Sequence, residues 1–232
     1  MAHSVQTEIE RKYAVGADTE LPALTGVGEA AGTPVVRAES SASVRLEAVY
    51  FDTADLALAR QRIALRVRRG GHDEGWHVKL PAAEGRTELQ WPLEPAGEPA
   101  EEATTSAAGV PDAADEVPAS VRDAVREHVG DAALTPLARV STDRALTDLL
   151  DADGAVVAEL ADDLVRTVDA RQGAERAWRE WEAELGPAAP PTAAGRTALL
   201  DEIEQRLLAA GATVSPSVSK LAQALGRTGL GH

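Results

Sequence analysis

The clearest regularity in the sequence is an alternation of apolar and charged residues near the N-terminus. Glu8, Glu10 and Lys12 fall two positions apart, so a β-strand over residues 5–15 would project them from one face. The opposite face would carry Val5, Thr7, Ile9, Tyr13 and Val15. We expect the apolar face to pack against other elements, which leaves the charged face turned toward solvent or toward a polar cavity.

The same alternation returns in four later segments. They are Leu65-Arg66-Val67-Arg68, residues 76–80 around Lys79, residues 86–89 and residues 180–185. An ordinary surface sheet would mix Ser, Thr, Gln and both charges on its outer face, whereas repeated doublets of one sign indicate strand faces that meet around a shared interior. The pattern therefore predicts an α+β protein with a closed antiparallel β-barrel of about eight strands, wide enough inside for one small ligand.

The remaining elements are predicted from caps, periodicity and turn residues. Helices are expected at 18–30, 54–60, 118–129, 197–210 and 217–225. Further strands are expected at 44–51, 137–146 and 156–164, with a glycine-rich hairpin loop at 70–75. Residues 94–117 are rich in Glu, Pro, Ala, Thr and Ser, which is typical of a solvated connection.

Composition limits the classes of protein that fit. A length of 232 residues with 44% hydrophobic content predicts one large domain, over residues 1–226 with a short tail at 227–232. The net charge of −15 argues against general nucleic-acid binding. Without cysteine there are no disulfides or thiolate metal ligands, and no segment resembles a signal peptide or a membrane span. We expect a cytoplasmic monomer or homodimer that does not bind membranes.

Lysine is rare in this chain, which makes its positions informative. Of the 23 basic residues only Lys12, Lys79 and Lys220 are lysines, and each lies beside a charged strand or helix. Lysine offers a compact charge on a flexible stem where arginine offers a planar fork. Buried charges must be paired or must coordinate an ion, so an interior holding both signs suits a polyanion together with a divalent metal. The alternative for any single strand is a solvated outer face.

Seven short motifs, in order along nearly the whole chain, resemble those of the CYTH superfamily, the triphosphate tunnel metalloenzymes. The motifs are Glu8-x-Glu10-x-Lys12, Tyr50-Phe51-Asp52-Thr53, Leu65-Arg66-x-Arg68, Trp76-x-x-Lys79, Gly85-Arg86-x-Glu88, Glu180-x-Glu182-x-Glu184-Leu185 and Ser219-Lys220. Arg144 is similar to a later basic position of the family, with Arg139 as a weaker candidate. One short charged pattern arises easily by chance, but seven in the right order are specific.

The resemblance implies a fold and a chemistry. Members hold a triphosphate inside an eight-stranded antiparallel tunnel and use Mg²⁺ or Mn²⁺ for phosphoryl or nucleotidyl transfer. The implied triphosphate-binding residues are Lys12, Arg66, Arg68, Lys79, Arg86, Arg144 and Lys220. The implied metal ligands are Glu8, Glu10, Glu88, Asp163, Glu182 and Glu184. Lys79 or Lys220 is the implied catalytic donor to the leaving oxygen.

These implied roles agree with elementary chemistry. A triphosphate carries about four negative charges near neutral pH, which arginine forks and lysine ammonium groups would offset. Carboxylate oxygens are the ligands that hard divalent cations prefer. A water molecule polarised by metal and carboxylate would then attack the terminal phosphorus, so catalysis is mostly positioning and charge stabilisation.

Several positions depart from the family pattern or leave alternatives. Gln90 stands where many members carry another Glu, and either Asp162 or Asp163 could supply the acidic residue before the late glutamates, with counting in twos favouring Asp163. An insertion at 168–177 lengthens a hairpin. We expect no functional role for the five histidines, and we expect His77 to alternate away from the lysine face.

The expected activity is metal-dependent hydrolysis of the terminal phosphate of inorganic triphosphate or a small organic triphosphate. One alternative is an adenylyl cyclase, which needs a purine pocket; the sequence shows no obvious stacking platform for one. Another is a non-catalytic module that binds polyphosphate or nucleotides. Because many bacterial relatives continue into a histidine-rich helical domain after a segment like 217–226, the chain is either a short member or the N-terminal part of a longer protein.

Overall fold

The computed structural model describes residues 3–93, 116–217 and 219–226. The chain forms two compact units, each assembled from three segments. The first unit comprises Met1–Thr7, Arg45–Ser141 and Thr167–Arg176, and the second comprises Glu8–Val44, Thr142–Arg166 and Ala177–His232. Nearly all of the predicted connection at 94–117, and the tail at 227–232, lie outside the described residues. The single domain over 1–226 stays a prediction.

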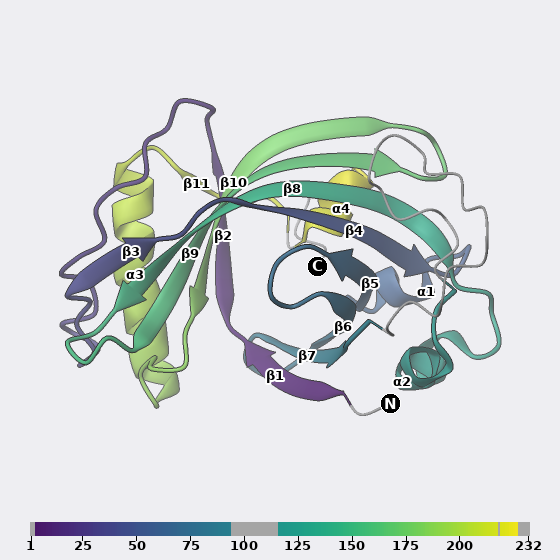
Figure 1. The fold of residues 1–232 in the computed structure, drawn as a ribbon, viewed down its shortest axis with the longest axis horizontal. Coiled ribbons are helices and arrows are strands. Elements are labelled where there is room, and N and C mark those ends of the chain that lie inside the picture. Colours follow the sequence, from purple (N-terminus) through teal and green to yellow (C-terminus); the bar gives the residue numbers. More distant parts are fainter. Residues whose placement is uncertain (1–2, 94–115, 218, 227–232) are drawn as a thin grey trace. The chain divides into compact units, whose positions relative to one another are not determined.

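Strands dominate the fold (Figure 1). They are β1 (Ser4–Glu8), β2 (Glu10–Val15), β3 (Arg37–Ser40), β4 (Val44–Asp52), β5 (Ala64–Arg69), β6 (Gly75–Pro81), β7 (Arg86–Trp91), β8 (Thr135–Leu150), β9 (Val156–Asp169), β10 (Glu175–Leu185) and β11 (Thr213–Val214). Their hydrogen-bonded order is β1-β7-β6-β5-β4-β8-β9-β10-β2-β11, and β3 pairs with β8. The pairs β4–β5, β5–β6, β6–β7 and β10–β2 are antiparallel.

The strand count corrects one part of the predicted fold. An antiparallel sheet with flanking helices is confirmed. The described strands, however, number eleven in an order that ends at β1 and β11, instead of eight in a closed ring. The predicted strand at 5–15 is interrupted at Ile9 because β1 pairs with β7 whereas β2 pairs with β10. The short strands β3 and β11 make up the rest of the difference.

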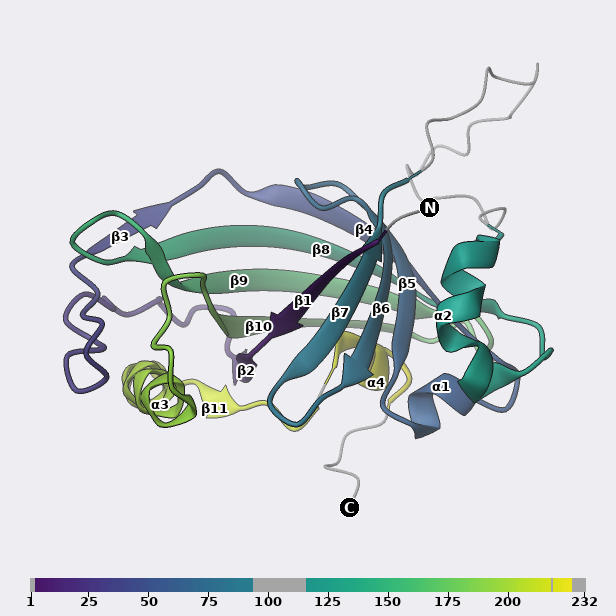
Figure 2. The same cartoon turned by 90° about the horizontal axis from the view of Figure 1, so that it is seen from below.

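In the first unit, the apolar face of the sheet packs against two helices. Helices α1 (Ala57–Arg60) and α2 (Ala119–Val129) lie beside β5 and β6 (Figure 2). Leu65, Val67 and Val78 are buried there. The α2 residues Val121 and Val125 pack against them, as their fourfold spacing predicts. Residues between these positions in β5 and β6 project to the opposite face, where the predicted cations lie.

A buried carboxylate joins β4 to α1. The side chain of Asp52 accepts hydrogen bonds from the backbone N–H groups of Thr53, Leu58 and Ala59, at 2.7, 3.0 and 3.0 Å. It thereby satisfies donors that a helix start leaves without partners. The motif Tyr50-Phe51-Asp52-Thr53 is thus explained by its structural role, since it ends a strand and begins a helix.

In the second unit, helix α3 (Ala193–Ala209) covers the apolar face of the sheet (Figure 1). Tyr13 of β2 and Trp181 of β10 are neighbours in the strand register. Both are fully buried and pack with Leu199 and Ile203 of α3. Burial of each large apolar side chain contributes roughly 1.5–3 kcal/mol. The alternate residues of β2 and β10 therefore project from the other face of the sheet.

The helix predictions are confirmed in part. Helix α3 begins at Ala193, four residues before the predicted start, because the Thr192 side chain caps it by accepting from Gly195 N at 3.1 Å. Helix α4 (Lys220–Ala224) lies within the predicted range. No described helix is long and apolar enough to cross a membrane.

The helix predicted at 18–30 is wrong, because this segment turns twice instead of coiling. Gly26 and Gly28 adopt positive φ angles of 82° and 87°. The backbone of this loop then pairs with itself, since Gly26 N donates to Val35 O at 2.8 Å. A Cβ atom at Gly28 would lie 2.3 Å from the Thr33 carbonyl oxygen, so the close turn requires glycine.

Tyr13 offers a pH-dependent test of the second unit's core. Its hydroxyl donates to Glu204 Oε2 at 3.1 Å, and burial together with this carboxylate raises the pKa of Tyr13 above its ordinary value of 10.0. Because the folded-state pKa is raised, the Tyr13 phenol makes its full contribution to the free energy of unfolding below pH 10.0. This contribution declines as the pH rises above that value. Tyr13→Phe should lower the free energy of unfolding by about 1–2 kcal/mol below that pH.

The loss should shrink at higher pH, because the wild type alone must keep a phenolic proton in order to stay folded. Denaturant unfolding of both proteins across this pH range measures the difference. If the difference in free energy of unfolding between the two proteins stays constant as the pH rises through 10.0, Tyr13 does not have this role.

Candidate metal and phosphate site

Seven charged side chains gather on the face of the second unit's sheet opposite its apolar core. We call them the mixed-charge cluster. Its members are Glu10, Lys12, Arg144, Asp163, Glu180, Glu182 and Lys220. They come from β2, β8, β9, β10 and α4. Six of the seven are site residues predicted from the sequence, and Glu180 is the addition.

Strand pairing brings the N-terminal motif to the late glutamates. Lys12 lies opposite Glu182 in the antiparallel register of β2 and β10. The Lys12 ammonium donates to Glu182 Oε1 and also to Glu10 Oε2, the latter at 3.0 Å. The alternation that buries Tyr13 and Trp181 on one face therefore sets Lys12 and Glu182 on the other.

Arg144 connects two of the buried carboxylates in the cluster, Asp163 and Glu182. Its Nε and Nη2 donate to the two oxygens of Asp163 at 2.8 and 2.6 Å. Nη2 also donates to Glu182 Oε2 at 2.5 Å. This two-point pairing uses the planar fork of arginine, which a lysine could not reproduce. Arg144 is thus held in a defined orientation beside Asp163 and Glu182.

Lys220 reaches three carboxylates from the start of α4. Its Nζ lies 2.8 Å from Asp163 Oδ2, 2.7 Å from Glu180 Oε1 and 2.6 Å from Glu182 Oε1. The preceding serines shape the turn that delivers it. The Ser219 side chain caps α4 by accepting from Ala222 N at 3.1 Å, and Ser217 Oγ donates to the Ser219 carbonyl at 2.9 Å.

Burial and mutual attraction set the charge states in this cluster. Burial alone would raise the pKa of Glu182, but Lys12, Lys220 and Arg144 lower it well below its ordinary value. Burial alone would lower the pKa of Lys220, but Glu182, Asp163 and Glu180 raise it. The pKa of Glu180 is raised, because burial and the neighbouring Glu182 outweigh the attraction of Lys220. Opposite charges therefore favour the ionised forms of Glu182 and Lys220 although both are buried.

The cluster contains carboxylate oxygens of the kind that hard divalent cations take as ligands. Asp163, Glu180 and Glu182 each offer a carboxylate oxygen, and these oxygens lie within 4.8 Å of one another. An all-carboxylate set fits Mg²⁺ or Mn²⁺ rather than a soft metal. In this structure the same oxygens are neutralised by Lys12, Arg144 and Lys220. A metal would fit once an added anion drew those cations away.

A second charged group lies in the first unit, on the sheet face opposite α1 and α2. The side chains of Arg66 and Lys79 each lie 3.7 Å from Glu88 Oε1, and Arg66 also donates to the Tyr50 hydroxyl at 3.3 Å. Lys79 and Glu88 are opposite each other in the register of β6 and β7. Three site residues predicted from separate motifs are thus neighbours.

His77 corrects the expectation about histidines. Residues 77 and 79 are two apart in β6, so His77 shares the face of Lys79 instead of alternating away from it. Its Nδ1 lies 2.9 Å from Glu88 Oε1 and its Nε2 lies 3.0 Å from the Asp73 carbonyl oxygen. Burial lowers the pKa of His77 to about 4, although Glu88 opposes the shift. His77 thus fixes the orientation of Glu88, together with Gln6, whose Nε2 donates to Glu88 Oε2 at 2.9 Å.

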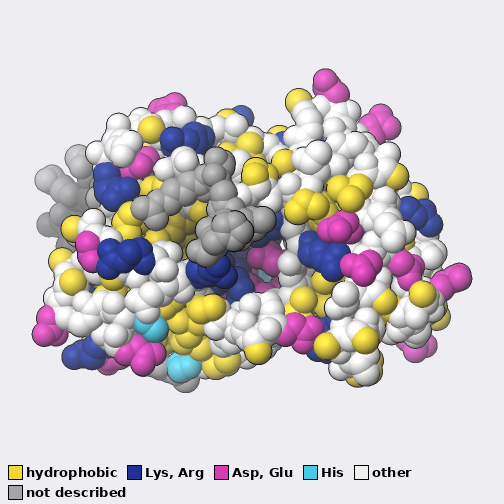
Figure 3. Space-filling model, turned by 180° about the vertical axis from the view of Figure 1, so that it is seen from behind, with side chains coloured by type: hydrophobic (Ala, Val, Ile, Leu, Met, Phe, Trp, Pro, Cys, Tyr) yellow, Lys and Arg dark blue, Asp and Glu magenta, His cyan; other side chains and the backbone are white. Residues whose placement is uncertain are grey.

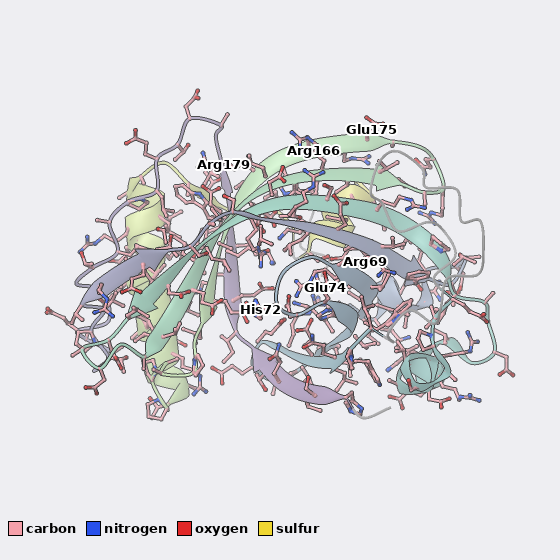
Figure 4. The ribbon with its side chains drawn as sticks, in the orientation of Figure 1. Arg69, His72, Glu74, Arg166, Glu175 and Arg179 are labelled. Carbon is pink, nitrogen blue, oxygen red and sulfur yellow. The ribbon has the colours of Figure 1, made fainter. Side chains whose placement is uncertain are left out.

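The other predicted site residues have different surroundings. Arg68 pairs with Asp73 at the β5–β6 hairpin. The predicted loop at 70–75 is confirmed there, with Arg69, His72 and Glu74 at the same hairpin (Figure 4). Arg86 Nη2 donates to the Arg62 carbonyl oxygen at 2.5 Å. In the second unit, Glu8 is buried and Glu184 lies opposite Glu10 in the register.

The structure separates the two candidate aspartates before the late glutamates. Asp163 is fully buried in the mixed-charge cluster. Asp162 instead accepts from Arg179 Nε and Nη2 at 2.8 and 2.7 Å. Arg179, labelled in Figure 4, also donates to the carbonyl oxygens of Ala17 and Thr19. Asp162 therefore has a structural role, and counting in twos along β9 identified the cluster residue.

Two residues were not predicted as site residues from the sequence: Glu180, a member of the cluster, and Trp178, its neighbour. Glu180 could have been included, because it continues the alternation of Glu182 and Glu184 along β10. Trp178 continues the same alternation by one more step, and its Nε1–H donates to Glu180 Oε2 at 2.5 Å. Over the described part of the face in Figure 3, acidic and basic side chains are interspersed.

Comparisons with known proteins agree with this fold. The profile of the CYTH domain matches residues 6–204. Two uncharacterised Mycobacterium tuberculosis proteins, from strains CDC 1551 and H37Rv, are 39% identical over 236 residues. The match covers 97% of the chain but only 41% of each relative, so the chain spans about two fifths of their length.

Solved structures show the same fold. A Bacillus halodurans protein described as a candidate adenylate cyclase superposes with a TM-score of 0.53 at 19% identity, covering 94% of this chain and 97% of its own. A Pyrococcus horikoshii protein superposes with a TM-score of 0.51 at 13% identity, covering 95% and 99%. The fold and the charged faces define an antiparallel β protein whose sheet carries clustered carboxylates and cations. The chain belongs to the CYTH family.

The mixed-charge cluster predicts a stability effect that a metal should reverse. Lys220→Met removes an ammonium group that is paired with three buried carboxylates, which should lower the free energy of unfolding by about 3–5 kcal/mol. Mn²⁺ should then raise the melting temperature of the variant more than that of the wild type, because the ion replaces the missing positive charge.

The matched control is Arg166→Met, which removes a cation 64% exposed and 3.4 Å from Asp143. Its effect should stay below about 1 kcal/mol. Equal Mn²⁺ shifts for wild type and Lys220→Met would show that the cluster does not take a metal.

Proposed function

We propose that the protein hydrolyses the terminal phosphate of inorganic triphosphate or of a small organic triphosphate, with Mg²⁺ or Mn²⁺ as its cofactor. The observation that carries the proposal is the mixed-charge cluster, in which three cations and four carboxylates share one buried place. A purely structural cluster would be an expensive way to stabilise a fold, because desolvation opposes the attraction of buried ion pairs.

The cluster is suited to exchange partners with a metal triphosphate. The ammonium groups of Lys12 and Lys220 and the guanidinium of Arg144 would turn from carboxylates to phosphate oxygens. Asp163, Glu180 and Glu182 would then be available to hold the cation, together with Glu10. Both charge signs remain satisfied throughout, so the exchange avoids leaving a buried charge alone.

The residues of this cluster would act mainly by position and charge. Lys12, Arg144 and Lys220 would hold the terminal phosphate and offset the charge that develops as the bond to the leaving oxygen breaks. A bound divalent cation supplies Lewis-acid polarisation and lowers the pKa of a coordinated water. Lys220 would donate a hydrogen bond to the leaving oxygen, and the same role for Lys79 stays a prediction from the family resemblance. The phosphate-binding roles of Arg66, Arg68, Lys79 and Arg86 stay predictions from the family resemblance, as do the metal-binding roles of Glu8, Glu88 and Glu184.

An adenylyl cyclase is the second candidate, and the Bacillus halodurans structure carries that description. Cyclisation requires the ribose 3′ oxygen in line with the α-phosphorus, whereas hydrolysis requires water at the terminal phosphorus. Product analysis distinguishes the two. Release of orthophosphate from inorganic triphosphate supports the hydrolase. Formation of cyclic AMP from ATP, with no reaction of inorganic triphosphate, would instead support the cyclase.

A charge-neutral substitution tests the cluster directly. Glu182→Gln should reduce kcat for phosphate release from inorganic triphosphate on the order of 100-fold or more, because an amide is a poor ligand for a hard cation and leaves the cations unbalanced. The matched control is Glu39→Gln on β3, whose side chain is 58% exposed beside Arg37.

The control should keep wild-type turnover. Both variants must unfold cooperatively for the comparison to count. Full activity of Glu182→Gln at saturating metal would exclude Glu182 from the reaction.

Partner exchange also predicts that metal and anion bind synergistically. Titration calorimetry should show weak Mg²⁺ binding to the protein alone, because the carboxylates are already ion-paired. A non-hydrolysable imido analogue of triphosphate should increase the Mg²⁺ affinity by a factor of about ten or more. This factor corresponds to a coupling free energy of about 1.4 kcal/mol. Mg²⁺ must increase the affinity for the analogue by the same factor, since coupling is reciprocal. Equal Mg²⁺ affinity with and without the analogue would contradict partner exchange.

A further inference from the structure

One aromatic ring stands apart from the others in this chain. Of the four tryptophans, Trp76, Trp91 and Trp181 are buried, at 6%, 3% and 0% exposure. Trp178 is only half-buried. A large apolar side chain that remains partly open beside a buried charged cluster has a surface available for a ligand.

The position of Trp178 is set by strand geometry. It precedes Glu180 by two residues in β10, so both side chains lie on the face of the mixed-charge cluster. The intervening residue, Arg179, projects to the other face, where its guanidinium lies 5.7 Å from the centre of the Trp181 ring. The Cα atoms of residues 178 and 182 are about 13 Å apart along a strand. That span is comparable to an extended triphosphate with its sugar.

A hydrogen bond keeps the Trp178 indole oriented. Its Nε1–H donates to Glu180 Oε2 at 2.5 Å, and Glu180 is in turn paired with Lys220 at 2.7 Å. Because the N–H edge is committed to the cluster, the flat face of the ring is held in a fixed direction at low conformational cost. Such preorganisation favours binding, since little rotamer freedom is left to lose.

We infer that Trp178 is a specificity-determining residue that stacks on the heteroaromatic ring of an organic triphosphate whose terminal phosphate lies at Lys12 and Glu182. The inference rests on the proposed function and narrows it. Nucleoside triphosphates and other triphosphate esters with a flat ring are then preferred over inorganic triphosphate. It also supplies the stacking platform for which the sequence alone showed no obvious candidate.

The test compares two variants and two substrates. Trp178→Ala removes the ring and the N–H donor, whereas Trp178→Phe keeps a smaller aromatic ring and removes the donor. With Mg²⁺, Trp178→Ala should lower kcat/KM for ATP relative to inorganic triphosphate by about 5- to 150-fold, the range expected for losing one stacked base. Trp178→Phe should retain most of the preference, and the loss in Trp178→Ala should lie mainly in KM.

Equal losses on both substrates in the two variants would assign Trp178 a purely structural role and overturn the inference. If Trp178→Ala leaves the ratio of kcat/KM for ATP to kcat/KM for inorganic triphosphate unchanged, the inference is also overturned. The proposed triphosphatase activity would stand in that case. Calorimetric binding of ATP and inorganic triphosphate provides a readout without turnover. If neither substrate is hydrolysed yet ATP binds more tightly and only Trp178→Ala removes the difference, the proposed hydrolysis fails and the stacking role stands.

Discussion

Burial of the Glu182 carboxylate among three cations is the interaction on which the candidate site depends. Lys12, Arg144 and Lys220 come from β2, β8 and α4, and each contacts Glu182. A carboxylate so deeply placed must be paired, because an isolated buried charge is far more costly than a buried ion pair. That requirement ties the start of the second unit to its last helix. In the proposed function, a polyanion and a metal would replace these internal partners.

Much of this arrangement could be predicted from the alternation of residue types. A period of two assigns faces without any tertiary knowledge, so the apolar and charged faces of β5, β6 and β10 were predictable. Glu10, Lys12 and Glu182 followed from the same rule, and counting in twos separated Asp163 from Asp162. The rarity of lysine indicated Lys220, although nothing in the sequence showed that one ammonium group would reach three carboxylates.

What could not be predicted depended on partners that are distant in the sequence. The interruption at Ile9 arises because β1 and β2 pair with different strands, and a local pattern does not contain that information. The loop at 18–30 has helix-like composition, but its glycines serve a turn that closes on Val35. His77 is different: its position was misjudged although the period of two places it beside Lys79. Its contact with Glu88 required the register of β6 and β7 to be known.

The central claim is that the carboxylates and cations of the mixed-charge cluster exchange their internal partners for a metal and a triphosphate. A crystal structure with Mn²⁺ and a non-hydrolysable imido analogue of triphosphate tests it most directly. The account predicts an anomalous manganese peak within coordination distance, about 2.2 Å, of oxygens from Glu182 and Asp163 or Glu180. Lys12, Arg144 and Lys220 should then contact phosphate oxygens. Ion pairs retained inside the cluster, with metal and analogue bound elsewhere, would contradict it.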